Sequence, residues 1–187
     1  MNDLIRAYVQ KKLDDYPNRL KHTEGVELVA IELSSIYNFD IQKASIAALT
    51  HDLMKCDTID EQIKFIDQQT IDHYRDFPVI YHAYAAANLI QIELNIQDED
   101  IINAVRYHVW GRPAMSLLEK IIFVADFVEP NREFREAKLY REIAKRDLDQ
   151  AVCLSMKSSI DYLIDQKMTP SIDQYKAYEY YKEVTRG

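Results

Sequence analysis

The chain has 187 residues and a mass of 22.0 kDa, enough for one domain with a substantial core, and its 48% hydrophobic and 29% charged residues exclude wholesale disorder. A net charge of -8 opposes binding to nucleic-acid backbones and to anionic membrane surfaces. Only 3 glycines are present, which excludes glycine-rich phosphate loops, and the 2 cysteines lack the spacing of a disulfide framework or a thiolate zinc site.

Apolar residues recur at intervals of three and four along nearly the whole chain, which predicts an all-α protein. A first helix is expected to stop near Pro17, and a second to end around Asn38. Asp40 is expected to cap the third helix. After a polar connector near residues 67–78, further helices are predicted over residues 79–94, 98–108, 116–127 and 139–164.

Two further features mark helix boundaries. Thr58 with Glu61, and Ser116 with Glu119, have the spacing of a capping box, in which a hydroxyl and a carboxylate satisfy free backbone donors at a helix start. Glu129-Pro130 is expected to end the helix that begins near Ser116, because proline disfavours helix at the residue before it.

No repeat or linker divides the sequence, so residues 1–187 are predicted to form a single domain with C-terminal helices over 139–187. The longest strongly apolar run, residues 121–125, is too short to span a bilayer, and no leader-like segment opens the chain. We therefore expect a cytoplasmic protein that has no membrane or nucleic-acid partner and is either a monomer or a homodimer.

Four of the 5 histidines lie on or beside apolar helical stripes and are expected to face inward: His22, His51, His82 and His108. Each of them alone is more typical of a hydrogen-bonded core histidine than of a metal ligand. Four neutral imidazoles in one small core are costly to bury, however, unless a metal ion binds them. His73 lies in a polar stretch and is expected to stay outside any site.

Two carboxylates complete this pattern. Asp52 follows His51 directly, and Asp126 closes the apolar segment 121–126. Asp126 is equally compatible with a surface carboxylate at a helix end, and the His-Asp dipeptide alone is weak evidence. Only the whole series is specific.

The series His22, His51-Asp52 and Asp126 resembles the H…HD…D signature of the HD-domain metallohydrolases, and His82 and His108 resemble the added ligands of its two-metal branch. Four strings of this sequence are similar to the bacterial YqeK family: residues 19–22, 51–55, 111–116 and 121–132. The resemblance covers roughly residues 19–170, with core motifs over 19–132, and implies an HD-domain helical bundle. Near residue 169 the family usually carries Ile-His-Pro, whereas this chain has Thr169, which leaves that element's part in nucleotide binding open.

The resemblance implies hydrolysis of diadenosine tetraphosphate at its central phosphoanhydride to two ADP, with two metal ions. Iron is the expected native metal, with Mn, Co, Ni or Zn as alternatives. His22, His51, Asp52 and Asp126 are expected to hold one ion, and His82 and His108 the other, with Asp52 bridging both. Two such cations can share a hydroxide that attacks phosphorus.

Positive side chains near these ligands are candidates for contact with phosphate. Lys55 follows His51 by one helical turn, Arg132 lies just past Asp126, and Arg19 precedes His22. We expect Asp52 and Lys55 to be catalytic, and the substrate contacts to be Arg19, Lys55, His108, Gly111 and Arg132. Each cation is also compatible with an ordinary surface role, and Gly111 with a plain helix C-terminal turn.

Two other functions remain open at this stage. A mononuclear HD phosphohydrolase acting on nucleoside monophosphates needs neither His82 nor His108. A non-catalytic helical module that binds nucleotides is typical of a broken ligand set, whereas all six positions are intact here.

Overall fold

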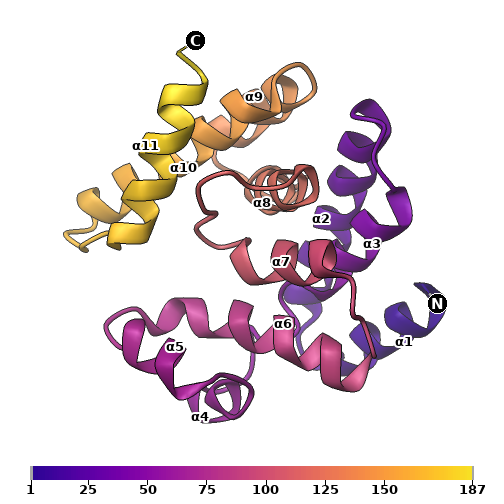
Figure 1. The fold of residues 1–187 in the computed structure, drawn as a ribbon. Helices are drawn as coiled ribbons and strands as arrows, with labels where there is room; N and C mark the ends of the chain where they lie inside the picture. The colour runs from indigo at the N-terminus through magenta and orange to yellow at the C-terminus, as the bar shows by residue number, and fades with distance from the viewer. Residues whose placement is uncertain (1, 187) are drawn as a thin grey trace.

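The structure is a computed structural model that describes residues 2–186 (Figure 1). These residues form eleven α-helices and two short 3-10 helices, with no strand among them, as the periodicity predicted. The elements in chain order are α1 (Asn2–Lys12), α2 (Pro17–Ile36), α3 (Ile41–Thr50), α4 (Ile59–Gln62), η1 (Ile63–Phe65), α5 (Gln68–His73), η2 (Pro78–Ile80), α6 (Tyr81–Glu93), α7 (Glu99–Tyr107), α8 (Leu117–Val128), α9 (Arg135–Ala144), α10 (Leu148–Asp165) and α11 (Ile172–Val184).

Side-chain caps begin several of these helices where the sequence predicted them. Asp40 accepts hydrogen bonds from the first-turn amides of α3, and Ser116 forms a full capping box with Glu119 at the start of α8. Thr58 also caps a helix, but α4 is only four residues long and passes directly into the turn η1. Pro17 occupies the first position of α2, where its missing N–H costs nothing.

The structure corrects two expected elements. The single helix predicted over residues 139–164 is in fact α9 and α10, separated at residues 145–147. Asp147 causes the break, because its side chain accepts a hydrogen bond from the Gln150 amide and starts α10 as an N-cap. The connector expected over residues 67–78 contains a further helix, α5, which Asp67 caps in the same way.

Five helices, α2, α3, α6, α7 and α8, pack together and form the centre of the molecule. Alanines occupy the inward positions of α3, which packs against α2 and α7, and of α6, which packs against α7. The fully buried ones are Ala44, Ala47, Ala48, Ala83, Ala85, Ala86 and Ala87. Such small side chains let helix backbones approach closely, which leaves little apolar filling between the ends of these helices. The polar site described below lies at those ends.

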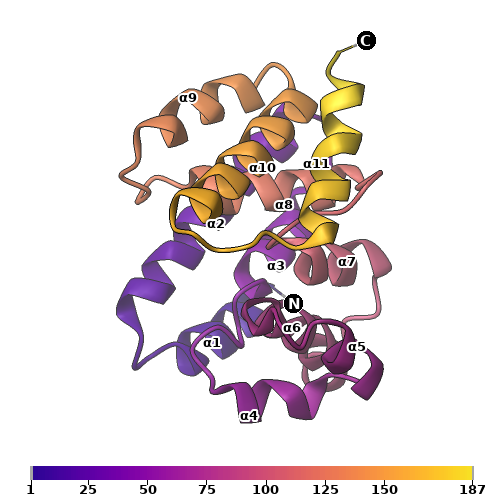
Figure 2. The ribbon, with the colours of Figure 1, turned by 90° about the vertical axis from the view of Figure 1, so that its left-hand side faces the viewer.

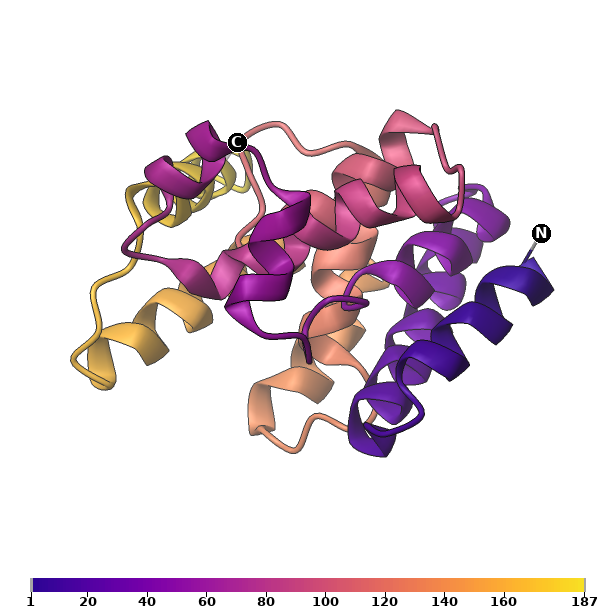
Figure 3. The ribbon, with the colours of Figure 1, turned by 90° about the horizontal axis from the view of Figure 1, so that it is seen from below.

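The remaining helices cover this centre from two sides. In Figure 2, α9, α10 and α11 lie above it, and α1, α4 and α5 lie below. Seen from below, α1 runs beside α2 and α3, far from α10 and α11 (Figure 3). Both cysteines are half-buried, not fully buried as thiols in a helical protein often are. Within residues 2–186, none of the helices combines the length and the apolar character needed to cross a membrane.

Candidate metal centre

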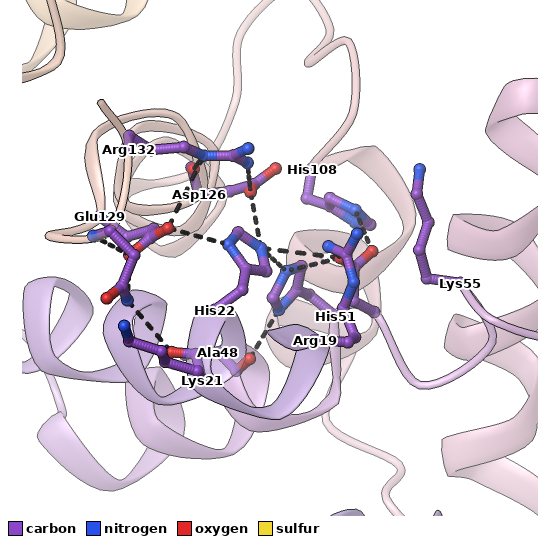
Figure 4. Close-up of polar contacts among 12 residues, drawn as sticks. Arg19, Lys21, His22, Ala48, His51, Lys55, His108, Asp126, Glu129 and Arg132 are labelled. Atoms are coloured by element: carbon purple, nitrogen blue, oxygen red, sulfur yellow. Dashed lines mark hydrogen bonds and ion pairs between the residues drawn. The ribbon is translucent and has the colours of Figure 1, made fainter. Parts of the chain in front are cut away.

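The structure gathers all six predicted ligands near the ends of the central helices. Figure 4 shows His22, His51, His108 and Asp126 among them. His51 and His108 are the C-cap residues of α3 and α7, and Asp52 follows at once. His82 lies in the first turn of α6, His22 in α2, and Asp126 in the last turn of α8. Helix ends that meet at one point thus bring together residues spread over more than half of the chain.

Asp52 lies between two pairs of imidazoles. Its Oδ2 atom is 3.4 Å from Nε2 of His51 and 3.7 Å from Nε2 of His22. Its Oδ1 atom is 3.2 Å from Nε2 of His82 and 3.4 Å from Nε2 of His108. The two oxygens of one carboxylate therefore face different histidine pairs, as expected of a bridging ligand.

Backbone carbonyls hold three of the imidazoles in one orientation. The Nδ1–H groups of His51, His82 and His108 donate to carbonyl oxygens three residues earlier, at 2.6 to 2.7 Å. For His51 and His108 these carbonyls belong to the last helical turn, where no helical partner remains. With the proton fixed on Nδ1, each Nε2 presents a lone pair to the centre, which is the tautomer that a metal ligand needs.

These atoms fit a metal ion better than they fit one another. The Nε2 atoms of His82 and His108 are 3.3 Å apart, and both face the carboxylate oxygen Oδ1 of Asp52. That oxygen is buried and has no hydrogen-bond donor. A tetrahedral or octahedral ion with bonds of about 2.1 Å sets neighbouring ligand atoms about 3.0–3.4 Å apart. A cation would supply the positive charge that this cluster of acceptors lacks.

The pKa values of the cluster reflect burial and mutual attraction. Burial raises the pKa of Asp52, but the surrounding imidazoles outweigh this effect and hold it well below its usual range. Burial likewise raises the pKa of Asp126, whereas the hydrogen bond of His22 and the proximity of His51 lower it more. Burial lowers the pKa of His82 to about 4, so this imidazole is neutral at pH 7 and ready to bind a cation.

Glu129 is a part of the site that the sequence reasoning missed. His22 places Nε2 at 3.1 Å from Asp126 Oδ1, and its Nδ1 lies 3.2 Å from Glu129 Oε1. The Glu129 side chain is almost fully buried and also accepts hydrogen bonds from the Asn131 backbone amide and side chain. Glu129 thus orients His22 as the carbonyls orient the other three imidazoles. The available signal was a carboxylate directly after a buried helix, which the sequence analysis used only as a helix end.

Three predicted cations surround the carboxylates. Arg19 Nη1 donates to Asp52 Oδ2 at 2.5 Å, and Arg132 Nη2 donates to Asp126 Oδ1 at 2.9 Å. Lys55 Nζ lies 3.5 Å from His82 Nε2, on the other side of the cluster, and stands apart from the arginines in Figure 4. These cations offset the charge of the carboxylates in the site, although the whole chain is acidic.

A broad cavity of about 650 Å³ opens beside His22. We call it the Arg19 cavity, because Arg19, Lys21 and Arg132 line it together with Tyr16 and other polar residues. Its size lies within the range of pockets that hold nucleotide-sized ligands. Phosphate groups placed there would meet three cations next to the predicted metal ligands.

The other residues singled out from the sequence lie elsewhere. Gly111 lies in the turn after α7, where its φ of 68° favours glycine, and it lines a smaller cavity away from the metal ligands. His73 is mostly exposed and contacts Asp173, outside the metal centre. Thr169 is exposed in the connection between α10 and α11.

The geometry can now be compared with known proteins. Residues 19–131, the segment that contains all six ligands and Glu129, match the HD domain. The chain belongs to the HD-domain family. This assignment explains why the ligands are spread so widely along the sequence, since the HD signature is completed only when the helix ends meet.

Similarity to individual HD-domain proteins extends over nearly the whole chain. The chain is 39% identical to the symmetrical bis(5'-nucleosyl)-tetraphosphatase of Bacillus subtilis (strain 168), over 93% of this chain and 94% of that protein. It is 42% identical to the protein of the same name from Halalkalibacterium halodurans, over 79% of this chain and 80% of that protein. A solved structure from Clostridium acetobutylicum, described as a predicted HD superfamily hydrolase involved in NAD metabolism, superposes with a TM-score of 0.88 at 34% identity, covering 100% of this chain and 98% of that one. These relatives confirm the family resemblance and the helical HD fold that the motifs predicted.

Proposed function

We propose that this HD-domain protein hydrolyses bis(5'-nucleosyl) tetraphosphates, diadenosine tetraphosphate among them, at the central phosphoanhydride to give two nucleoside diphosphates. The names of relatives that are 39% and 42% identical support this substrate class. The observation that carries the proposal is the placement of Asp52, whose two oxygens face separate histidine pairs beside a cavity lined by cations. Charged nucleotides do not cross membranes unaided, so this activity fits the cytoplasmic location expected from the sequence.

The residues present suit two divalent metal ions. His22, His51, Asp52 and Asp126 would hold one ion, and Asp52, His82 and His108 the other. Imidazole and carboxylate ligands suit Fe, Mn, Co, Ni or Zn better than Ca, and iron is the metal that we propose for the native protein. When bound, such ions would stabilise the charge on phosphoryl oxygens as Lewis acids. They would also lower the pKa of a water molecule, so that hydroxide is available as the nucleophile at neutral pH.

The chain's own residues bind and orient the tetraphosphate. Arg19 and Arg132 lie where the Arg19 cavity meets the carboxylates, so they would grip phosphate oxygens on the side of His22. Lys55, beside His82, would stabilise negative charge that grows on the opposite side as the phosphoanhydride breaks. Cations on both sides of the centre favour a substrate whose phosphates extend in both directions from the bond that is cut.

The products of the reaction test the proposal. Purified protein is incubated with diadenosine tetraphosphate and Fe²⁺, Mn²⁺ or Co²⁺, and the nucleotides are separated by anion-exchange chromatography. ADP as the sole product is expected. A mixture of ATP and AMP would show asymmetric cleavage and overturn the proposed position of attack, and unchanged substrate with every metal would favour a nucleotide-binding module.

The number of metal ions is tested separately. The variant His82→Ala should bind about one metal ion per chain instead of two, by elemental analysis, and should lose activity by at least 10²-fold. His73→Ala, an exposed histidine outside the centre, is the matched control for metal content and should keep both metals. Full activity of His82→Ala with one metal per chain would contradict the two-metal scheme.

A further inference from the structure

A second cavity, of about 120 Å³, lies away from the Arg19 cavity. We call it the Trp110 cavity. Four aromatic side chains line it: Tyr74 directly after α5, Tyr84 from α6, Tyr107 at the end of α7, and Trp110 in the turn that follows α7. None of the six metal ligands lines it, and neither the HD signature nor the chemistry described above gives it a role.

The rings form a connected aromatic wall. The Tyr74 ring contacts those of Tyr84 and Trp110, with centroids 5.5 and 5.7 Å apart, and Tyr84 meets Tyr107 edge to face at 6.3 Å. Phe77 supports Trp110 from behind at 5.7 Å. Because each ring contacts another, the rings hold one another in place before a ligand arrives.

Polar groups stand at the edge of this aromatic wall. Asp173, at the start of α11, accepts a hydrogen bond from the Tyr74 hydroxyl at 3.1 Å, and Tyr84 donates to the Tyr74 oxygen at 3.2 Å. Arg112 stacks over Tyr107 at 4.9 Å, and its guanidinium is held by Glu119 through two hydrogen bonds. A flat heteroaromatic ring with donors and acceptors on its edge fits such a lining.

The size of the cavity points to part of a larger ligand. Pockets for whole drug-sized ligands occupy about 300–1,000 Å³, so a volume of 120 Å³ suits a single nucleobase and not an entire nucleotide. The Arg19 cavity differs in both respects, since it is larger and three cationic side chains line it, with no cluster of aromatic rings among its lining residues.

The Trp110 cavity is built on the same helix ends as one half of the metal centre. Ile80, on its wall, precedes His82 by two residues, and Tyr107 directly precedes His108. In Figure 2 the turn between α1 and α2, which lines the Arg19 cavity, lies at the left, and α5 and the start of α11 lie at the right. The metal centre therefore has one cavity near the His22 side and another near the His82–His108 side.

We propose that the Trp110 cavity receives one nucleobase of the dinucleotide substrate, stacked against Tyr84, Tyr107 and Trp110. This inference rests on the proposed function. It assigns the two chemically equal arms of the substrate to unequal places: one arm extends into the open, cation-lined Arg19 cavity, and the base of the other arm is held by aromatic rings.

The single tryptophan of the chain provides a direct test, because Trp110 itself lines the cavity. The metal-loaded protein is titrated with a non-hydrolysable, methylene-bridged diadenosine tetraphosphate while tryptophan emission is recorded. We expect a saturable quench, because a stacked purine contacts the indole. Inorganic tripolyphosphate, which has no base, should occupy the metal centre and leave the emission unchanged.

Substitutions locate the stacking. Tyr107→Leu and Tyr84→Leu, which each remove a ring but keep an apolar side chain, should raise the half-saturating concentration and the KM for diadenosine tetraphosphate about tenfold, with kcat changed less than threefold. Tyr162→Leu, which replaces an exposed tyrosine on α10, should behave like the wild type. Thermal unfolding of each variant shows that it is folded.

The outcomes separate this inference from the function on which it rests. If wild-type protein releases ADP but the analogue leaves Trp110 emission unchanged, or if both leucine variants keep the wild-type KM, the base does not bind in this cavity and the inference is wrong. If the analogue quenches Trp110 emission but no ADP forms, the nucleobase site stands and the proposed hydrolysis is wrong.

Discussion

The carboxylate of Asp52 lies between Arg19 and the imidazoles of the site. One of its oxygens meets Arg19, His22 and His51, and the other meets His82 and His108 without any hydrogen-bond donor. A buried acceptor without a partner costs free energy, and two imidazole lone pairs directed at it add to that cost. Such an arrangement is stable only when a cation is bound between these groups, or when protons on the imidazoles take the place of that cation. The protonation of each imidazole therefore depends on what lies next to it.

Glu129 provides the first prediction at this scale. Replacing it with glutamine removes the negative charge that faces Nδ1 of His22 and should weaken metal binding at that half of the centre by about 10- to 100-fold. Calorimetric titration with Mn²⁺ measures the effect. Glu133→Gln, an exposed neighbour in the same loop, should bind Mn²⁺ like the wild type. Equal affinities for both variants would mean that Glu129 does not orient His22.

His82 predicts how the metal-free protein responds to acid. Burial lowers its pKa from 6.5 to about 4, so below about pH 6.5 the unfolded chain binds more protons than the folded one, and stability falls as the pH falls. This residue alone should remove about 1 kcal/mol of stability between pH 7.5 and 5.5. Urea unfolding with chelator present measures the loss, which should be smaller by that amount in His82→Gln and unchanged in His73→Gln. A wild-type pH dependence in His82→Gln would contradict this reasoning.

At the level of single residues, the sequence predicted more of the centre than of its supports. Histidines on apolar helical stripes, and an aspartate at the end of a buried helix, are rare in ordinary helices. The six candidate ligands could therefore be picked out from the sequence alone. Glu129 could not, because a glutamate before proline at a helix end is ordinary. The carbonyls that orient the other imidazoles carry no signal at all, since every residue has one.

At the level of elements, the boundaries of the helices decide where the ligands lie. His51 and His108 can direct Nδ1 to a free carbonyl only because α3 and α7 end there. Caps at Asp40 and Ser116 were visible in the sequence, and both helices begin where predicted. The break between α9 and α10 was not visible, because apolar residues keep their helical spacing across it, and only the local competition of Asp147 for the backbone stops the helix.

Asp147 therefore carries the prediction for this scale. Removing the cap with Asp147→Ala should lower the free energy of unfolding by about 1 kcal/mol, whereas Asp147→Asn should retain most of it, because asparagine caps helices nearly as well. For a chain of this length about 1 kcal/mol corresponds to a melting temperature lower by about 2–4 °C. Equal melting temperatures of the alanine variant and the wild type would show that tertiary packing alone sets the break.

On the scale of the whole molecule, an acidic chain concentrates a few cations around one polar centre. Packing of α2, α3, α6, α7 and α8 by small alanines brings their ends together, and the ligands occupy the volume that apolar side chains fill in other helical cores. The sequence predicted the helical class and the convergence of the ligands. It could not predict the two cavities, because their walls come from residues that meet only after α5, α7 and α11 have packed.

This architecture predicts that metal ions stabilise the whole fold and not only the reaction. The ligands come from α2, α3, α6, α7 and α8, so an ion bound to the folded state joins helices that the unfolded chain leaves apart. At a free metal concentration of about 100 times the dissociation constant, each ion adds about 2.7 kcal/mol, and two ions should raise the melting temperature by about 10–20 °C over chelated protein. Calorimetry of chelated and Mn²⁺-reloaded protein measures this shift. His51→Gln should lose at least half of it, and His73→Gln none, because His73 lies outside the centre. If the melting temperature does not change when chelator is added, packing alone holds the helix ends together. The Oδ1 atom of Asp52 would then need another hydrogen-bond donor.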